Sequence, residues 1–428
     1  MSEEKPARDK RIDPVEAACD DAVKNLSVQS SDAAECRLKS LIEAHPEHLA
    51  PRFYLAQLYQ WLATHQEPGV LNRGKLRLAL EHARAALGVE SPPRLETVRL
   101  VREILHAMAF HQENATFCRS IERQHPDPLV RFHALCWSSV ALQCRAHELV
   151  AEGMTANADA ANRKSVQMHK DALGQLPNLT AQQLLESYFG ESHTVRAYLD
   201  SGSGAEWVKG VLAIIDGPTR ESLPSGLLVE QLCHVADAAC DAGLAQEAIR
   251  VAEQALTEQA SPRPGGKDMI WRIHALGAIF RACRLAGRED RAEIAARQIE
   301  AELAQWETAP GASSGKKADQ RPAAGYNVAA RYFLVAKDWD RAITAARRAA
   351  ELWDFGPNHF LLALALWSGR KARAATLDAL RNAARDAIMS GKGACRNLRV
   401  DFLTSPAFAD VRDDPEFLKA IEVAGVID

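Results

Sequence analysis

Apolar residues in this chain recur every three or four positions, and a glycine joins the two clearest runs. The first run carries Val235, Ala236 and Ala239, and the second carries Ala248, Ala252, Ala255 and Leu256. A spacing of three or four places such residues on one face of a helix. Gly243, between the runs, can adopt the left-handed conformation that ends a helix. Because the side chains are small, the segment Leu232 to Leu256 predicts two closely packed antiparallel helices.

Weaker copies of the pattern occupy much of the chain. Helices are predicted over Val15 to Leu26, Leu95 to His111, 128–145 and 147–174, and a last pair over 358–390. His-Pro steps at His45 and His125 end helices, because proline disfavours a helix that continues through it. No alternating apolar and polar pattern typical of strands occurs. The predicted fold class is therefore all-α.

Five of these segments resemble tetratricopeptide (TPR) repeats, namely 31–46, 49–92, 229–257, 273–300 and 323–350. The resemblance implies an α-solenoid of TPR-like antiparallel helix hairpins, arranged as one array or as two halves. The alanine stripes recur at longer intervals than the roughly 34 residues of the family. A different α-solenoid with long helices is the structural alternative.

The chain divides into five predicted segments. They are a flexible leader (1–13), N-terminal TPR-like repeats (14–177), an irregular helical join (178–225), C-terminal TPR-like repeats (226–390) that include a mobile loop (307–325), and a C-terminal capping segment (391–428).

The tail carries a second resemblance. Leu398, Asp401, Phe402 and Leu403, followed by residues 411–421, resemble the segment that closes many bacterial TPR arrays, in which a short apolar ladder precedes an Asp-Pro turn. A terminal repeat exposes an apolar face and needs a cap. We expect Asp414 to cap the last helix, Pro415 to open it, and Phe417, Leu418 and Ile421 to cover the exposed face.

Proteins of this family bind peptides or protein surfaces in a concave groove lined by the first helix of each hairpin. The resemblance implies these partner-binding positions: Phe53, Gln57, Gln60, Trp61, His274, Arg281, Arg284, Asn327 and Arg331, with Glu230, Asp237 and Asp241 beside them. Together, Arg281, Arg284, Asn327 and Arg331 would form a cationic, amide-bearing patch. Such a patch would favour an acidic segment or a C-terminal carboxylate, because guanidinium groups bind carboxylates through two parallel hydrogen bonds. This arrangement does not match the carboxylate-clamp pattern known in the family. The alternative to a binding patch is that these arginines are solvated side chains on helix surfaces.

Charge and composition narrow the function. The 428 residues carry a net charge of −4, which gives no overall attraction to nucleic acid or acidic membranes. No apolar run is long enough to span a bilayer, and the nine cysteines are scattered without CxxC pairs, which favours a reduced, cytoplasmic protein.

His106 and His111 lie five apart in one predicted helix, off the spacing of four that would let both bind one metal. Phosphate-binding loops and catalytic motifs are also missing from the sequence, so it predicts no cofactor, metal or catalytic residue.

The leading hypothesis is a non-catalytic, cytoplasmic, bacterial scaffold that binds a protein or peptide, with an acidic segment as one candidate for the bound part. A regulatory or accessory subunit of a neighbouring enzyme or signalling system, with 178–225 as a hinge, is the second hypothesis. An enzyme with a helical active site in 128–225 is the third, since catalytic residues need not fall in recognisable motifs.

Overall fold

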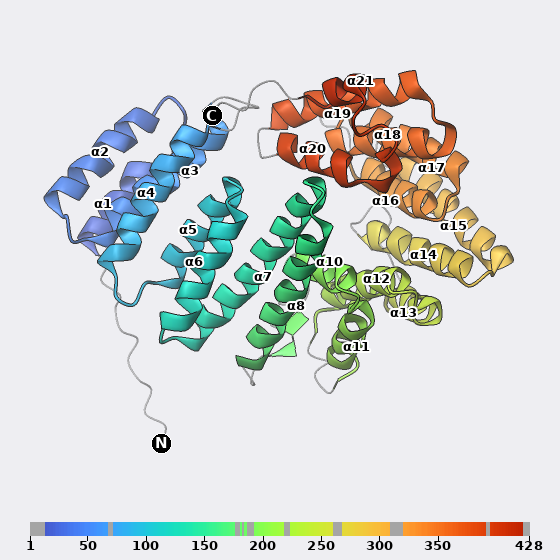
Figure 1. Ribbon diagram of the computed structural model, residues 1–428, viewed down its shortest axis with the longest axis horizontal. Coiled ribbons are helices and arrows are strands. Elements are labelled where there is room, and N and C mark those ends of the chain that lie inside the picture. The colour runs from blue at the N-terminus through green and yellow to red at the C-terminus, as the bar shows by residue number, and fades with distance from the viewer. Residues whose placement is uncertain are drawn as a thin grey trace.

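A computed structural model describes residues 13–66, 72–175, 180, 181, 184, 185, 192–217, 223–259, 268–308, 320–390 and 394–422. Every element with defined bounds in this part of the chain is a helix (Figure 1). The first half contains α1 (Pro14–Val23), α2 (Ser31–Ala44), α3 (Leu49–His65), α4 (Arg73–Val89), α5 (Leu95–Ala107), α6 (His111–Gln124), α7 (Pro128–Ala151), α8 (Thr155–Gln175), α10 (Ser192–Asp200) and α11 (Gly204–Ile215). The second half contains α12 (Ser225–Asp241), α13 (Ala245–Glu258), α14 (Asp268–Leu285), α15 (Glu289–Thr308), α16 (Arg321–Val335), α17 (Trp339–Leu352), α18 (Gly356–Arg370), α19 (Arg373–Ser390), α20 (Ala394–Thr404), the short 3-10 helix η2 (Pro406–Phe408) and α21 (Pro415–Ala420).

Consecutive helices pack as hairpins, and the hairpins stack on one another. α3 packs on α4, α7 on α8, α12 on α13, α14 on α15, α16 on α17, and α18 on α19. α14 also contacts α12 and α16, which are the first helices of the hairpins before and after it. Each hairpin therefore covers the apolar face of its neighbour, which is how a helical solenoid builds a continuous core. The predicted all-α solenoid of helix hairpins is confirmed.

One turn motif joins the two helices at six of the described hairpins. In each, the first helix is followed by a residue with positive φ, and the next residue donates its N–H to the carbonyl five positions back. The residues with positive φ are Ala109, Gly153, Gly202, Gly243, Gly287 and Lys337, with φ between 58° and 77°. This is the Schellman arrangement, which satisfies carbonyls that the helix end leaves unpaired. The left-handed conformation predicted for Gly243 is confirmed.

Small residues bring the helices close together. In the hairpin of α12 and α13, Val235, Ala236, Ala239, Ala252 and Ala255 are all fully buried. At other places a glycine makes room for a large side chain. A Cβ on Gly277 in α14 would overlap the ring of Tyr332 in α16, and a Cβ on Gly325 in α16 would lie 2.8 Å from the ring of Trp306 in α15. Close backbone approach and filled gaps together give the dense packing of a protein interior.

Two predicted helix boundaries were wrong. α5 ends at Ala107 and His111 begins α6, so the predicted helix Leu95 to His111 is two elements. Its turn uses Ala109 where other turns use glycine, so the sequence carried no glycine signal there. The predicted break near residue 146 does not exist, because α7 runs unbroken to Ala151 and turns at Gly153. Arg145 and Ala146 both favour helix, and nothing beside them stops one.

Other predicted segments are described only in part. Residues 1–12 of the predicted leader and 309–319 of the predicted loop lie outside the described residues. α15 continues to Thr308 and α16 begins at Arg321. Within 178–225, α10 and α11 are joined at Gly202 by the same turn as the other hairpins.

The C-terminal cap forms as its residue types predict. The Asp414 side chain accepts a hydrogen bond from the N–H of Glu416 at 2.9 Å, and Pro415 is the first residue of α21. Phe417 is fully buried among Trp367, Phe402 and Phe408. Ile421 is buried and Leu418 is half-buried against the same cluster. The aromatic cluster therefore covers the apolar end of the last hairpin.

The second part of the chain curves back on itself. α20 packs against α7, although more than half of the chain separates them (Figure 1). Residues 404–406 also line a cavity of about 440 Å³ together with His147 of α7, Asn162 of α8 and Asp200 of α10. Helices α7 to α20 therefore form a closed curve, and α1 to α6 extend from it.

Candidate functional site

The predicted groove residues of the early repeat all lie on α3. Gln57 is exposed, whereas Phe53, Gln60 and Trp61 are half-buried. The Trp61 ring stacks on His65 with the ring centroids 4.8 Å apart. This part of α3 therefore presents a mixed aromatic and amide surface.

Two of the predicted groove arginines form ion pairs within the chain. The Arg281 guanidinium donates to Asp241 of α12, and that of Arg284 donates to Glu289 at the start of α15. A cation that already holds an intramolecular carboxylate gains less from an incoming one. The structure therefore does not bring Arg281, Arg284 and Arg331 together as one uncompensated cationic patch.

His274 belongs to a polar cluster that links three first helices. The buried hydroxyl of Tyr332 in α16 donates to Oδ1 of Asp237 in α12 at 2.5 Å. Nδ1 of His274 in α14 lies 3.2 Å from the same hydroxyl. Burial, followed by the charge of Asp237, raises the pKa of Tyr332 well above its ordinary value, so the hydroxyl keeps its proton. The cluster therefore ties α12, α14 and α16 together.

Asn327 also has a partner within the chain. Its amide Nδ2 donates to Oδ1 of Asn358 in α18 at 2.7 Å. Asn358 is buried and donates in turn to the carbonyl of Trp353 at 3.0 Å. Asn327 therefore joins α16 to the start of α18.

Unlike Arg281 and Arg284, the third predicted groove arginine, Arg331, lines a pocket. This pocket has a volume of about 660 Å³ and lies between α16, α18, α19 and α20. Most of the lining is apolar: Leu334, Val335, Phe355, Pro357, Phe360, Leu361, Leu364, Ala383, Ala387 and Leu398. Within the described residues, no hydrogen bond or ion pair engages its guanidinium. The pocket therefore combines an apolar wall with one available cation.

Two carboxylates complete the lining of this pocket. Asp386 is occupied, because its Oδ2 accepts the N–H of Gly356 at 2.6 Å. Burial raises the pKa of Asp401, and the charge of Arg331 opposes that rise. Burial likewise lowers the pKa of Arg331, against the opposing charge of Asp401. Arg331 and Asp401 both line the pocket and remain exposed, so the Arg331 guanidinium is open to an incoming anion.

The sequence predicted Arg331 as a groove residue but did not predict this pocket. Phe355, Phe360 and Leu364 come from the start and middle of α18, and Leu398 comes from the tail ladder that was assigned to capping. Val335, the last residue of α16, is 53% exposed, which is unusual for a large apolar side chain. These elements meet only because the tail folds back over α18 and α19, which no local pattern indicates.

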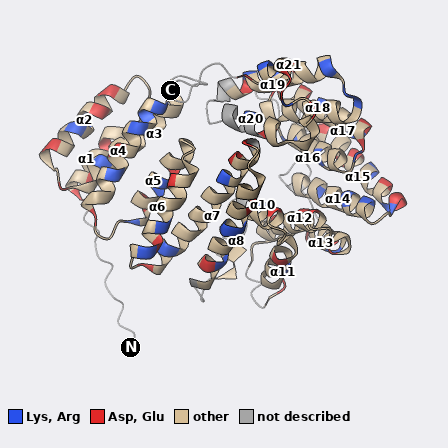
Figure 2. Ribbon diagram, in the orientation of Figure 1, with Lys and Arg blue, Asp and Glu red and all other residues tan. Residues whose placement is uncertain are grey.

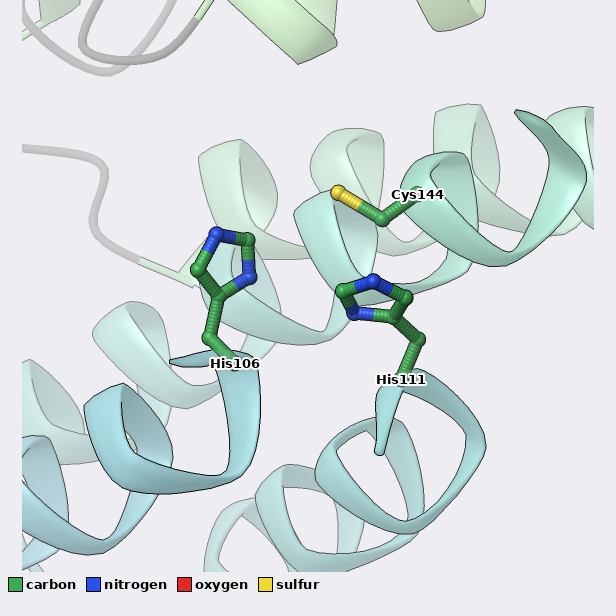
Figure 3. Close-up of side chains that lie close together, drawn as sticks. All are labelled: His106, His111 and Cys144. Atoms are coloured by element: carbon green, nitrogen blue, oxygen red, sulfur yellow. The ribbon is translucent and has the colours of Figure 1, made fainter. Parts of the chain in front are cut away.

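A second cluster of side chains lies between α5, α6 and α7 (Figure 3). His106 lies near the end of α5, His111 begins α6, and Cys144 comes from α7. The imidazole and thiol atoms that could bind a metal all lie within 4.8 Å of one another. His111 and Cys144 are each 9% exposed, and His106 is half-buried. The sequence argument against a pair of histidines assumed that both lie on a single helix. The turn at Ala109 instead brings the two rings together, with centroids 5.4 Å apart and ring planes tilted by 57°.

Comparison with known proteins finds similar solved structures but no similar sequence family. No protein-family model matches the chain, and no curated protein sequence matches it. Among solved structures, it is similar to the human IFIT1 dimer with PPP-AAAA, with 11% identity, 95% of this chain and 92% of that chain covered, and a TM-score of 0.36. It is also similar to the P58(IPK) TPR domain (11% identity, 90% and 98% covered, TM-score 0.25) and to yeast Tom70 (10% identity, 95% and 98% covered, TM-score 0.22).

Proposed function

We propose that the chain is a non-catalytic interaction scaffold that holds a segment of a partner protein in the pocket between α16, α18, α19 and α20. The observation that carries this proposal is Arg331, a cation with no ion pair among the described residues, set in an apolar wall. An apolar side chain of the partner fills the pocket, and an acidic group of the partner lies on Arg331. This combination suits a peptide segment, because apolar burial supplies affinity while a single charged contact fixes the register.

The distribution of charge supports a protein partner. Lys and Arg alternate with Asp and Glu over the visible helices (Figure 2). Arg341 bonds to Glu293, and Arg348 bonds to Glu307, so even arginine-bearing helices are neutralised locally. Nucleic acid requires a basic stripe that stays uncompensated. Among the described helices, none combines the length and the hydrophobicity needed to cross a bilayer.

Site-specific photo-crosslinking tests this proposal in cells that naturally express the protein. A photoreactive amino acid replaces Val335 at the pocket, and in a control chain it replaces Ile294, a 59% exposed residue of α15 that does not line the pocket. We expect a discrete adduct with one partner protein from position 335 only. An adduct common to both positions, or none from 335, would contradict a pocket that holds a partner.

Charge reversal tests the role of Arg331 in the same assay. Arg331→Glu should remove the adduct from position 335, because a carboxylate then repels the acidic group of the partner. Arg347→Glu, on the exposed face of α17, is the matched control and should leave the adduct unchanged. If the Arg331→Glu chain gave an adduct of equal yield, Arg331 would not bind an acidic group of the partner. Arg281 is unsuitable for this test, because its reversal would also set two carboxylates against each other at Asp241.

A further inference from the structure

The cluster of His106, His111 and Cys144 combines three side chains that each bind transition metals. An imidazole nitrogen and a thiolate sulfur are preferred ligands of Zn²⁺, which takes four ligands in a tetrahedron. The three residues come from three successive helices, so their meeting depends on the fold and not on a local motif. We propose that His106, His111 and Cys144 form a zinc site that pins the turn between α5 and α6 to α7.

The geometry is close to what zinc requires. With Zn–N of about 2.0–2.1 Å and Zn–S of about 2.3 Å, tetrahedral ligand atoms lie roughly 3.3–3.7 Å apart. The candidate atoms lie within 4.8 Å of one another. The ligand atoms would have to approach one another by about 1 Å for all three to reach one ion.

Glu148 lies beside this group of three residues and is the proposed fourth donor. It lies one helical turn after Cys144 on α7, so the two side chains project from the same face. Its Oε1 is 3.7 Å from Nε2 of His111. Its Oε2 accepts a hydrogen bond from Arg145 at 3.1 Å, which holds the carboxylate in place. Two imidazoles, one thiolate and one carboxylate match the ligand preferences of Zn²⁺.

The surrounding helices hold the ligands in a firm frame. Ile104 and Leu105, beside His106, are fully buried, and so is Ala141, one turn before Cys144. The side chains beside the ligands are therefore fixed by packing. Such a site serves a structural role, because the ion ties three elements and its ligands are largely withdrawn from solvent.

Metal content and spectroscopy test the zinc site on the full-length chain. After incubation with ZnSO4 and desalting, we expect about one Zn²⁺ per chain by mass spectrometry of the metal. Replacement by Co²⁺ should give visible bands of tetrahedral cobalt and a near-ultraviolet thiolate-to-cobalt absorption. Cys144→Ser should abolish that absorption. Cys136→Ser, also on α7 and outside the cluster, is the matched control and should preserve it. Glu148→Gln should weaken zinc binding by about 10- to 100-fold.

A measurement on the unsubstituted chain covers the case in which a variant does not fold. Zinc should slow the alkylation of Cys144 by iodoacetamide, followed by peptide mass spectrometry, and a chelator should restore the rate. Alkylation of the exposed Cys36 should not respond to zinc. The proposal is overturned if the desalted chain retains no zinc, if Cys144→Ser and Cys136→Ser give the same cobalt spectrum, or if zinc leaves the alkylation of Cys144 unchanged.

Discussion

Glycine fills the left-handed turn position at four of the described hairpins, but Ala109 and Lys337 fill it at two others. A left-handed backbone costs a residue with a Cβ about 1–2 kcal/mol, whereas glycine adopts it freely. The alanine and lysine turns therefore carry strain that the packing of their helices must offset.

Lys337→Gly should stabilise the protein by about 0.5–1 kcal/mol, because relief of the strained backbone outweighs the added entropy of glycine in the unfolded chain. Gly243→Ala should destabilise it by about 1 kcal/mol for the opposite reason. Urea unfolding followed by circular dichroism measures both. Equal midpoints for Lys337→Gly and the unsubstituted chain would contradict strain at this turn.

Gly277→Ala should destabilise the protein by roughly 1–3 kcal/mol, because the new Cβ would meet the ring of Tyr332 and push α14 away from α16. Helix propensity alone predicts the reverse sign, by about 1 kcal/mol. Gly88→Ala in α4 is the matched control, since no atom lies within 4 Å of its Cβ position. It should be neutral or stabilising in the same unfolding experiment, and a stabilising Gly277→Ala would refute the clash.

The second helices of successive hairpins are joined by ion pairs across their outer faces. Arg291 of α15 bonds to Glu253 of α13. Arg341 of α17 bonds to Glu293 and Glu300 of α15, and Arg348 of α17 bonds to Glu307 of α15. Such pairs set the rotation of one hairpin against the next, in addition to the alanine packing beneath them.

The pair of Arg341 and Glu293 should make stability depend on pH. Hydrogen bonds from Arg341, and then from Arg297, lower the pKa of Glu293 to about 2 from an ordinary value of 4.5. The contribution of the pair is therefore complete above pH 4.5 and is lost as the pH falls towards 2. Arg341→Met should lower the urea midpoint at pH 7, and its difference from the unsubstituted chain should shrink below pH 4.5. Arg347→Met on the same helix should show no such convergence, and a difference that is constant with pH would contradict the assignment.

Sequence periodicity predicted the elements well wherever a residue acts on its own helix. The alanine stripes of α12 and α13, the turn at Gly243 and the cap at Asp414 depend on residues a few positions apart, and all three are present. The turn at Ala109 was missed because alanine gives no signal for a left-handed backbone. The ion pairs of Arg281 and Arg284 were missed because each partner lies on another helix.

At the scale of the whole molecule, the cap protects the end of the repeat array. Phe417→Ala should cost about 3–5 kcal/mol of local stability, because it opens a cavity among Trp367, Phe402 and Phe408. In a repeat protein, such a loss weakens the nearest hairpin most. Hydrogen exchange should therefore speed up in α18 to α21 and stay unchanged in α3 and α4. Faster hydrogen exchange along the whole chain would indicate a single cooperative unit instead. Leu418→Ala, at a half-buried position, is the control and should accelerate exchange in α18 to α21 less than Phe417→Ala does.

The candidate sites show the limit of sequence reasoning at this scale. Arg331 was predicted from its position on a first helix, but its pocket needs Leu398 and Asp401 of α20 to complete the wall. His106, His111 and Cys144 meet across three helices, at distances that only the packing of α5, α6 and α7 determines. Both sites depend on contacts between distant segments, and periodicity within one helix carries no information about those.

The contact between α20 and α7 has a consequence for synthesis on the ribosome. Because translation proceeds from the N-terminus, α7 is synthesised well before the helix that packs against it. A nascent chain of this protein therefore exposes that surface of α7 until α20 has left the exit tunnel. Chaperones that bind unfinished polypeptides should associate with the nascent chain during this interval.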